Sequence, residues 1–233
     1  MQSPVAAFKY LTIWGRLSAS QPTPAMIGAA AAYFPLVGLV LGLLLAFLNY
    51  GLGLYLASEI LSIVLIAFLL VATGATHLES TKSTFDAMAP KAAHATNSHI
   101  LGFVAIVFVI LFKTGAIDVM DERLAVSLLL TPVVARWALV IFIYGYHDRC
   151  EEIPRVIAEN VKFWHLLAAT LFALGLAVYL LGRKGLWLGL ALSVFALLSR
   201  SLLHRRHAAL THDNFGAVIE WSEALSLILL ASL

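Results

Sequence analysis

Acidic side chains stand at and inside the last apolar stretch of the chain, Asn214–Leu233. Asp213 precedes this stretch, and Glu220 and Glu223 lie about 10 and 14 Å into it at 1.5 Å per helical residue. Carboxylates in a membrane cost about 2.5–3.5 kcal/mol each on insertion scales, so each indicates a partner or a function. Asp213 and Glu220 share one helical face with Gly216, which leaves room for another helix or a ligand.

Two basic residues lie inside other apolar stretches. Arg136 is roughly 14 Å from the same side of the membrane as Glu223, which places the two at equal depth. Two interpretations stay open, a structural Arg136–Glu223 ion pair and a polar cavity that opens to the cytoplasm. Lys113 is nearer the opposite side, and snorkelling of its ammonium group to the interface is the favoured explanation.

A third polar group follows the second apolar stretch. If the helix continues there, Glu79, Ser83 and Asp86 fall at i, i+4 and i+7 on one stripe. Oxygen ligands on one stripe suit Mg²⁺, which is usually bound by one or two carboxylates and substrate phosphates. The alternative is a wet helix face, because Lys82 is spaced to pair with both acids. On composition alone, the ion pairs are favoured.

The elements that position these groups follow from composition. Hydrophobic residues make up 61% of the 233 residues and charged residues 12%, against roughly 25% charged in a soluble domain. This excludes a soluble enzyme and a nucleic-acid-binding domain. We predict one membrane domain, residues 1–233, with an all-α fold: a polytopic helix bundle with an N-terminal interfacial helix, Ser3–Leu17. The seven predicted spans are Ile27–Leu48, Ile60–Thr76, His99–Met120, Leu124–Tyr144, Phe163–Leu181, Gly185–Leu203 and Asn214–Leu233, the second broken near Gly74.

Lysine and arginine positions predict the orientation. With the N-terminus in the cytoplasm, ten of these residues fall on the cytoplasmic side, including Lys91 and Arg149, and three on the other side. This positive-inside bias predicts a multi-pass protein of a bacterial or archaeal cytoplasmic membrane. The longer connections, 77–98 and 146–162, then also lie on the cytoplasmic side, together with the polar site.

Several segments, in order along the chain, resemble one family, the integral-membrane cobalamin-5′-phosphate synthases (adenosylcobinamide-GDP ribazoletransferases). The segment AYFPLVGLVLG is similar to the family's "FPLVGLxxG", GATHLE to "GGLHLDG", PVVARWA to "PxxxRWA", and LTHDNFGA with the two later glutamates to "TGDxLGAxxExxE". These segments are Ala32–Gly42, Gly74–Glu79, Pro132–Ala138 and Leu210–Ala217, and Phe8–Thr12 resembles the family's "FxxLT".

The resemblance implies a Mg²⁺-dependent phosphoryl transfer. A ribose hydroxyl of α-ribazole, or of its 5′-phosphate, attacks the corrinoid-linked phosphate of adenosylcobinamide-GDP, and GMP leaves. In such reactions the protein positions the reactants while a cation neutralises charge. The implied metal ligands are Glu79 and Asp86, the implied catalytic acids are Asp213 and Glu220, and the implied substrate-binding residues are His77, Ser83, Arg136 and Glu223.

The aspartate-rich loop departs from the family pattern. Glu79 replaces its first aspartate and Ser83 its second, which removes a negative charge, while Asp86 is retained. Residues 95–102 lack the family's aspartate and arginine, and arginine is a phosphate clamp that other residues reproduce poorly. Two hypotheses follow: a membrane ribazoletransferase, and a catalytically silent scaffold or accessory subunit. A transporter is disfavoured because no repeat is evident. The expected partners are the two substrates and the lipid bilayer; association of identical chains stays open.

Overall fold

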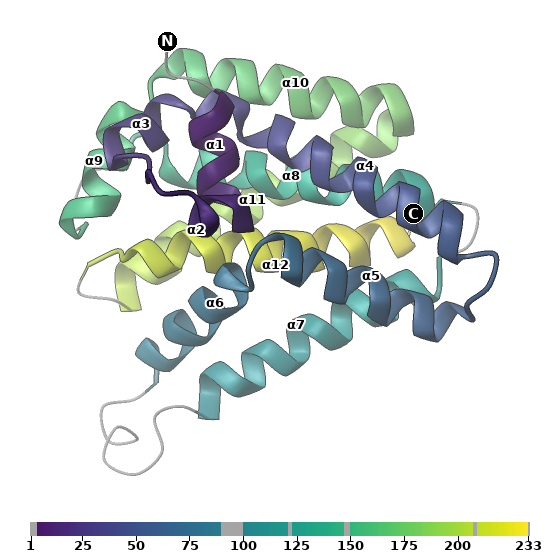
Figure 1. Ribbon diagram of the computed structural model, residues 1–233. Coiled ribbons are helices and arrows are strands. Elements are labelled where there is room, and N and C mark those ends of the chain that lie inside the picture. The colour runs from purple at the N-terminus through teal and green to yellow at the C-terminus, as the bar shows by residue number, and fades with distance from the viewer. Residues whose placement is uncertain (1–3, 90–99, 121–122, 147–149, 207–208, 233) are drawn as a thin grey trace.

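The computed structural model describes residues 4–89, 100–120, 123–146, 150–206 and 209–232 (Figure 1). Helices form nearly all of these residues, and the described part of the chain holds no β-strand beyond an isolated bridge between Cys150 and Leu210. The predicted all-α membrane bundle is confirmed. Lys91, Arg149 and residues 95–99, which entered the sequence predictions, lie outside the described residues.

Six stretches of the described chain are long and apolar enough to cross a membrane, and a bent helix pair makes up to seven. The predicted spans therefore each correspond to helix, with ends shifted by a few residues. The six are η1 (Ala31–Tyr33) with α4 (Phe34–Leu52), α7 (Ile100–Asp118), α8 (Leu124–Ile143), α10 (Phe163–Leu181), α11 (Arg183–Arg206) and α12 (His212–Ser232).

The bent pair confirms the predicted break near Gly74. Helix α5 (Ser58–Ala72) and helix α6 (Thr76–Ala87) meet at an angle of 88°. Gly74 and Ala75 both have positive φ, and the Ala75 N–H donates to the Leu70 carbonyl at 2.7 Å. This is the left-handed helix ending that glycine favours. The bend turns the polar α6 away from the apolar α5.

The N-terminal boundaries differ from the prediction. The first span begins at Ala31 instead of Ile27, because Pro24–Ala29 forms a separate helix, α3, whose first turn is capped by Thr23. Proline in the first turn and a threonine before it are typical helix-start signals. The predicted helix Ser3–Leu17 is two helices, α1 (Pro4–Leu11) and α2 (Ile13–Leu17).

The connection 146–162, predicted as a loop, contains helix α9 (Glu152–Asn160). Its composition is too polar for a span, and its apolar residues are confined to one face. Ile157 and Ala158 on that face are buried, and α9 packs against α3. A Cβ at Gly28 of α3 would collide with the Ile157 carbonyl oxygen. The one-sided apolar pattern suits a helix that packs by one face, but only the tertiary structure shows that α3 is its partner.

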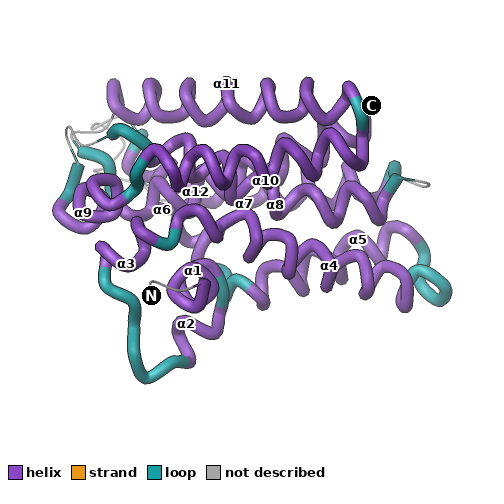
Figure 2. Tube along the Cα trace, turned by 90° about the horizontal axis from the view of Figure 1, so that it is seen from above, coloured by secondary structure: helices purple, strands orange, loops and turns teal. Residues whose placement is uncertain are grey.

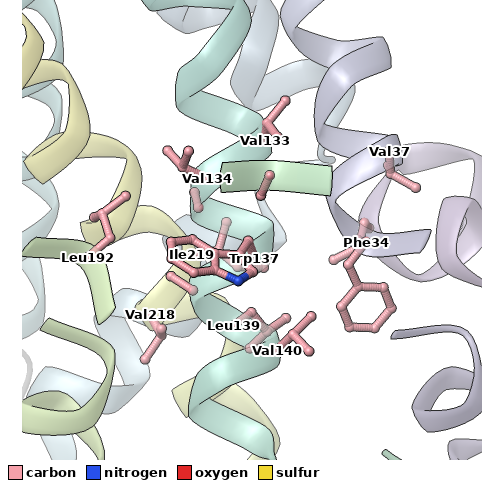
Figure 3. Packing of buried hydrophobic residues seen from close by; sticks show 14 of the residues in the cluster. Phe34, Val37, Val133, Val134, Trp137, Leu139, Val140, Leu192, Val218 and Ile219 are labelled. Atoms are coloured by element: carbon pink, nitrogen blue, oxygen red, sulfur yellow. The ribbon is translucent and has the colours of Figure 1, made fainter. Parts of the chain in front are cut away.

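Helices α8 and α12 form the centre of the bundle (Figures 1 and 2). Of the apolar stretch of α8, 83% is buried, compared with 17% of α10. Figure 3 shows Trp137 of α8 with Phe34 and Val37 of α4 on one side, and with Leu192 of α11 and Val218 of α12 on the other. The indole N–H of Trp137 donates to Thr170 Oγ1 at 3.0 Å. The charged residues Arg136 of α8 and Glu220 and Glu223 of α12 are thus enclosed by protein, away from lipid.

Glycines bring α4 and α8 close together. A Cβ at Gly38 would collide with the Pro132 carbonyl oxygen, and one at Gly42 would collide with that of Leu129. Small residues four apart let helix backbones approach in membranes, where van der Waals contact drives association. The G-x-x-x-G spacing of Gly38 and Gly42 therefore accounts for the close packing of α4 against α8.

Candidate functional site

Four charged side chains from three helices meet inside the bundle, and we call them the ion quartet: Lys113 of α7, Arg136 of α8, and Glu220 and Glu223 of α12. Lys113 Nζ lies 2.5 Å from Glu220 Oε1 and 2.5 Å from Glu223 Oε2. Arg136 Nη1 donates to Glu223 Oε1. All four side chains are at most 3% exposed. Of the two interpretations of Arg136, the ion pair with Glu223 is therefore the one that the structure shows.

The snorkelling predicted for Lys113 is wrong. Its side chain is 1% exposed and points to the carboxylates of α12. The physical reason is charge balance: two buried carboxylates need two cations, and Arg136 supplies only one. Because uncompensated buried charges cost several kcal/mol, the second cation is drawn inward instead of to the interface. This count of intramembrane charges is the sequence signal that identifies Lys113.

A polar cavity of about 250 Å³ lies where the N-terminal segment covers the facing ends of α6 and α12. Helix α6 supplies His77 and Ser80, and helix α12 supplies His212 and Gly216. The polar lining residues are Lys9, Tyr10, Thr12, Gln21, Thr76, His77, Ser80 and His212. Burial raises the pKa of the Tyr10 phenol above its ordinary value, so it keeps its proton at neutral pH.

Asp213 stands beside this cavity. The Ser80 hydroxyl donates to Asp213 Oδ1 at 3.5 Å, and a Cβ at Gly216 would lie 2.5 Å from Ser80 Oγ. The absence of a side chain at Gly216 thus lets α6 approach α12 here, as its position between Asp213 and Glu220 suggested. Asn214 strengthens the contact, since its Nδ2 donates to Thr84 Oγ1 at 3.1 Å.

Some buried donors and acceptors near the cavity have no hydrogen-bond partner. His77 Nδ1 is one, and Arg136 Nε and Nη2 are two more. His77 lines the cavity, and it lies within electrostatic range of Arg136 and Glu223. Buried polar groups are nearly always satisfied, so an orphaned group at a cavity wall is where a ligand or water is expected.

The predicted stripe of Glu79, Ser83 and Asp86 on α6 contacts helix α7 through Asp86. Asp86 Oδ2 pairs with Lys82 at 2.8 Å, and Asp86 Oδ1 accepts the Gly102 N–H of α7 at 2.8 Å. Glu79 is exposed and Ser83 is half-buried. The Lys82–Asp86 pair belongs to the wet-face alternative. Asp86 also satisfies an N–H in the first turn of α7, one of the four that a helix start leaves unpaired.

Among the described residues, no group of three or more His, Cys, Asp or Glu side chains is arranged to hold a metal ion. The structure brings His77 and Asp213 to the polar cavity and its rim, and it collects Arg136, Glu220 and Glu223 in the ion quartet. It does not bring Glu79, Ser83 and Asp86 together with the quartet. The metal, catalytic and substrate-binding roles of all these residues stay predictions.

The sequence predictions missed the N-terminal wall of the cavity. Lys9, Tyr10 and Thr12 come from α1 and the residue that follows it. The segment Phe8–Thr12 resembled the family's "FxxLT", which was the available signal. Its apolar pattern indicated an interfacial helix, and nothing in that pattern places it over α6 and α12.

Comparison with known proteins agrees with the motifs. The cobalamin-5-phosphate synthase family matches residues 3–231. An adenosylcobinamide-GDP ribazoletransferase of Geotalea daltonii is 30% identical over 216 residues, which cover 89% of this chain and 87% of that protein. One of Pseudomonas putida is 30% identical, covering 90% of each chain. One of Synechococcus elongatus is 29% identical, covering 94% of this chain and 92% of that protein.

No solved structure matches the chain. The family match includes the N-terminal segment, α6 and α12, which line the polar cavity, and all four members of the ion quartet. The relatives carry the name of a transferase and cover nearly the whole of this chain. The chain is a multi-pass membrane protein that belongs to the cobalamin-5-phosphate synthase family.

Proposed function

We propose that this protein is an adenosylcobinamide-GDP ribazoletransferase of cobalamin synthesis. It joins α-ribazole, or its 5′-phosphate, to the corrinoid-linked phosphate of adenosylcobinamide-GDP, and GMP leaves. One observation carries the proposal beyond the names of the relatives. Two family-like segments, Gly74–Glu79 and Leu210–Ala217, are far apart in sequence, yet both contribute to the same polar cavity. A site at this junction would give the two family-like segments a common role.

The cavity supports a division of roles. Phosphoryl transfer needs positioned reactants and compensation of charge on the phosphate oxygens. In the proposal, Asp213 accepts the proton of the attacking ribose hydroxyl, since it is the half-buried carboxylate at the rim. His77 and Ser80 bind polar groups of the substrate. His77 Nδ1 is buried at the wall without a partner, which supports this assignment.

In the same proposal, Mg²⁺ binds to oxygen donors at the rim. Glu79 is exposed beside Ser80, which is hydrogen-bonded to Asp213 on the facing helix. Two carboxylates with substrate phosphates are the usual magnesium environment. We propose Glu79 and Asp213 as the protein ligands, and a bound cation would neutralise charge on the phosphates. Asp86 is better suited to holding α6 against α7, because Lys82 and Gly102 already engage its two oxygens.

In the same proposal, the role of three quartet residues is structural: Arg136, Glu220 and Glu223 hold helices in place and do not contact the substrate. They lie in the ion quartet, at most 3% exposed, and none lines the polar cavity. Their effect would be to fix the start of α12, and with it Asp213, relative to α6. The implied substrate contact of Arg136 and the implied proton transfer by Glu220 are replaced by this positioning role.

We further propose that the polar cavity faces the cytoplasm. Arg123 and Lys184 line one pocket together with Leu230, near the C-terminal end of α12, whereas the polar cavity lies at the N-terminal end of that helix. They are two of the three basic residues assigned to the outer side, against ten assigned to the side of the cavity. This asymmetry is the positive-inside pattern. Labelling of single cysteines placed at Arg123 and Glu152 in intact cells tests the orientation.

The decisive experiment measures GMP release. The protein in lipid nanodiscs receives Mg²⁺, adenosylcobinamide-GDP and α-ribazole. The Asp213→Asn variant should fold normally and lose about 10²–10⁴-fold in rate, the range for a general base. The exposed acid Glu152 gives the matched control, Glu152→Gln, with no expected loss. Absence of GMP release by the wild type, together with failure to rescue a synthase-deficient strain, would overturn the proposal.

A silent scaffold is the second candidate, and the engagement of Asp86 favours it. A loop acid that is a metal ligand in the family pattern here holds two helices together. If this is a scaffold, Glu79→Ala will leave the cellular phenotype intact while Gly38→Val, which disrupts the α4–α8 contact, abolishes it. If the protein is the transferase, both changes will abolish the phenotype.

A further inference from the structure

An apolar groove of about 630 Å³ runs between the N-terminal helices and the outer face of α4. Its volume is in the roughly 300–1,000 Å³ range of small-molecule sites. It is separate in character from the polar cavity, since its walls are almost wholly apolar. We call it the N-terminal groove, and its main walls are Val5, Phe8, Trp14, Tyr33, Leu36 and Val40.

The groove lies at the level where a bilayer changes from apolar to polar. Figure 1 shows α1 crossing the direction of α4 instead of running beside it. Helix α4 is a membrane span, so α1 lies in the plane of the membrane at its end. One face of α1 is buried against the bundle, and it carries Ala6, Ala7 and Leu11. Trp14 and Tyr33 remain exposed at 58% and 37%, as aromatic residues are at membrane interfaces.

Lys9 supplies a cation at the inner end of the groove. Its ammonium group donates to the Ser20 carbonyl at 3.0 Å and to the Ser20 hydroxyl at 2.9 Å. An ammonium has three N–H groups, so one remains for a ligand. Lys9 lines both the N-terminal groove and the polar cavity. A ligand that suits this place has a long apolar part and an anionic head.

We propose that the N-terminal groove binds one acyl chain of an anionic phospholipid, with the lipid phosphate on Lys9. The bilayer supplies this molecule at this depth, and a basic residue at the interface attracts anionic headgroups. The lipid then fills the angle between α1 and α4 and places its headgroup at the edge of the polar cavity. This inference is independent of the reaction proposed above.

The first test measures phospholipid that stays bound through purification in mild detergent. Wild type is compared with Val40→Phe, which narrows the groove from the α4 wall. Leu43→Phe is the matched control, because Leu43 is exposed on α4 and is not part of the groove. We expect wild type and Leu43→Phe to retain phospholipid and Val40→Phe to lose most of it. Equal retention by all three overturns the proposal.

The second test places the lipid. Nanodiscs are made with phosphatidylglycerol or phosphatidylcholine whose acyl chains carry bromine, which quenches tryptophan fluorescence. Subtracting the Trp14→Phe signal isolates Trp14. We expect stronger quenching of Trp14 by the anionic lipid, and loss of that difference in Lys9→Gln. Arg123→Gln, at the opposite end of the bundle, should leave the difference unchanged.

Two results contradict the proposal. Equal quenching of Trp14 by both brominated lipids would mean that bulk bilayer fills the groove without recognition of charge. A dimer in native mass spectrometry that carries no lipid, and that Val40→Phe dissociates, would mean that a second copy of the chain occupies it. Substrates are absent from both tests, so neither outcome depends on whether the protein transfers ribazole.

Discussion

The ion quartet and the polar cavity are both polar regions inside an apolar bundle, yet they differ in how their polar groups are paired. In the quartet, Glu220 and Glu223 are matched by Lys113 and Arg136, and no member is more than 3% exposed. In the cavity, His77 Nδ1 has no partner and Asp213 is only half-buried. The charges of the quartet are balanced within it, although Arg136 Nε and Nη2 have no hydrogen-bond partner, whereas the cavity has open space beside the unpaired His77 Nδ1.

The difference teaches that the depth of an acid in the membrane does not by itself distinguish a structural role from a catalytic one. Glu220 lies deeper in the membrane than Asp213, and both were candidates for the catalytic acid in the sequence. A buried pair contributes little net stability, but removing one member leaves an uncompensated charge. The free-energy cost of burying Glu220 is therefore offset within the quartet, where its carboxylate pairs with Lys113 of a neighbouring helix. Changes in the quartet should lower stability first, while changes at the cavity rim should lower activity first.

The largest expected effect is that of Lys113→Met. The two carboxylates of the quartet would then face one cation, and loss of one partner from a buried pair costs about 3–5 kcal/mol. We expect the free energy of unfolding, measured by denaturant titration in mixed micelles, to fall by about that amount. Arg123→Met, which removes an exposed cation, should change it by less than about 0.5 kcal/mol. Similar losses in both variants would contradict a structural quartet.

A compensating change should restore much of that loss. Lys113→Met combined with Glu220→Gln removes one charge of each sign, and coupling energies between contacting residues are about 0.5–3 kcal/mol. We expect the double variant to be more stable than Lys113→Met alone, by the same titration. Glu223→Gln should compensate less, since it also deprives Arg136 of its carboxylate. Equal recovery in both combinations would show that the pairing is not as specific as the structure has it.

Gly216→Ala tests the boundary between the two regions. The added Cβ would lie 2.5 Å from Ser80 Oγ, and overpacking costs about 1–3 kcal/mol. Because the contact also sets the cavity, GMP release should fall even at temperatures where the variant stays folded. Gly115→Ala is the control, since its Cβ would meet open space. If the Gly216→Ala variant kept full activity, the close contact between α6 and α12 would not be needed for GMP release.

The smallest expected effect is that of Lys82→Met. The Lys82–Asp86 pair is partly exposed, with the lysine side chain 29% accessible, and helix pairs at i, i+4 contribute about 0.3–0.5 kcal/mol. Asp86 keeps its bond to the Gly102 N–H. Thermal unfolding should therefore shift by only a few degrees or less. A loss as large as that of Lys113→Met would mean that this stripe, too, is a buried charge network.

Much of the fold was predictable because membrane spans can be recognised from their amino-acid composition. The runs Leu124–Ile143 and Phe163–Leu181 were placed within a residue of their observed ends, since a span needs about 20 apolar residues in a row. Helix α9 and the division of the N-terminal segment at Thr12 were missed. Both depend on local breaks and tertiary contacts that leave no long apolar run.

The sequence by itself determined that the protein is a helical membrane protein, which depths hold charge, and which family motifs it carries. These are properties of composition and spacing. Tertiary structure alone decided that Lys113 joins the Arg136–Glu223 pair, because that contact depends on how α7, α8 and α12 are rotated against one another. It moved Lys113 from the interface to the centre of the bundle and brought His77 and Ser80 to Gly216. Side chains more than a hundred residues apart meet only when helices pack, and that packing is set by shape and charge balance across the whole bundle.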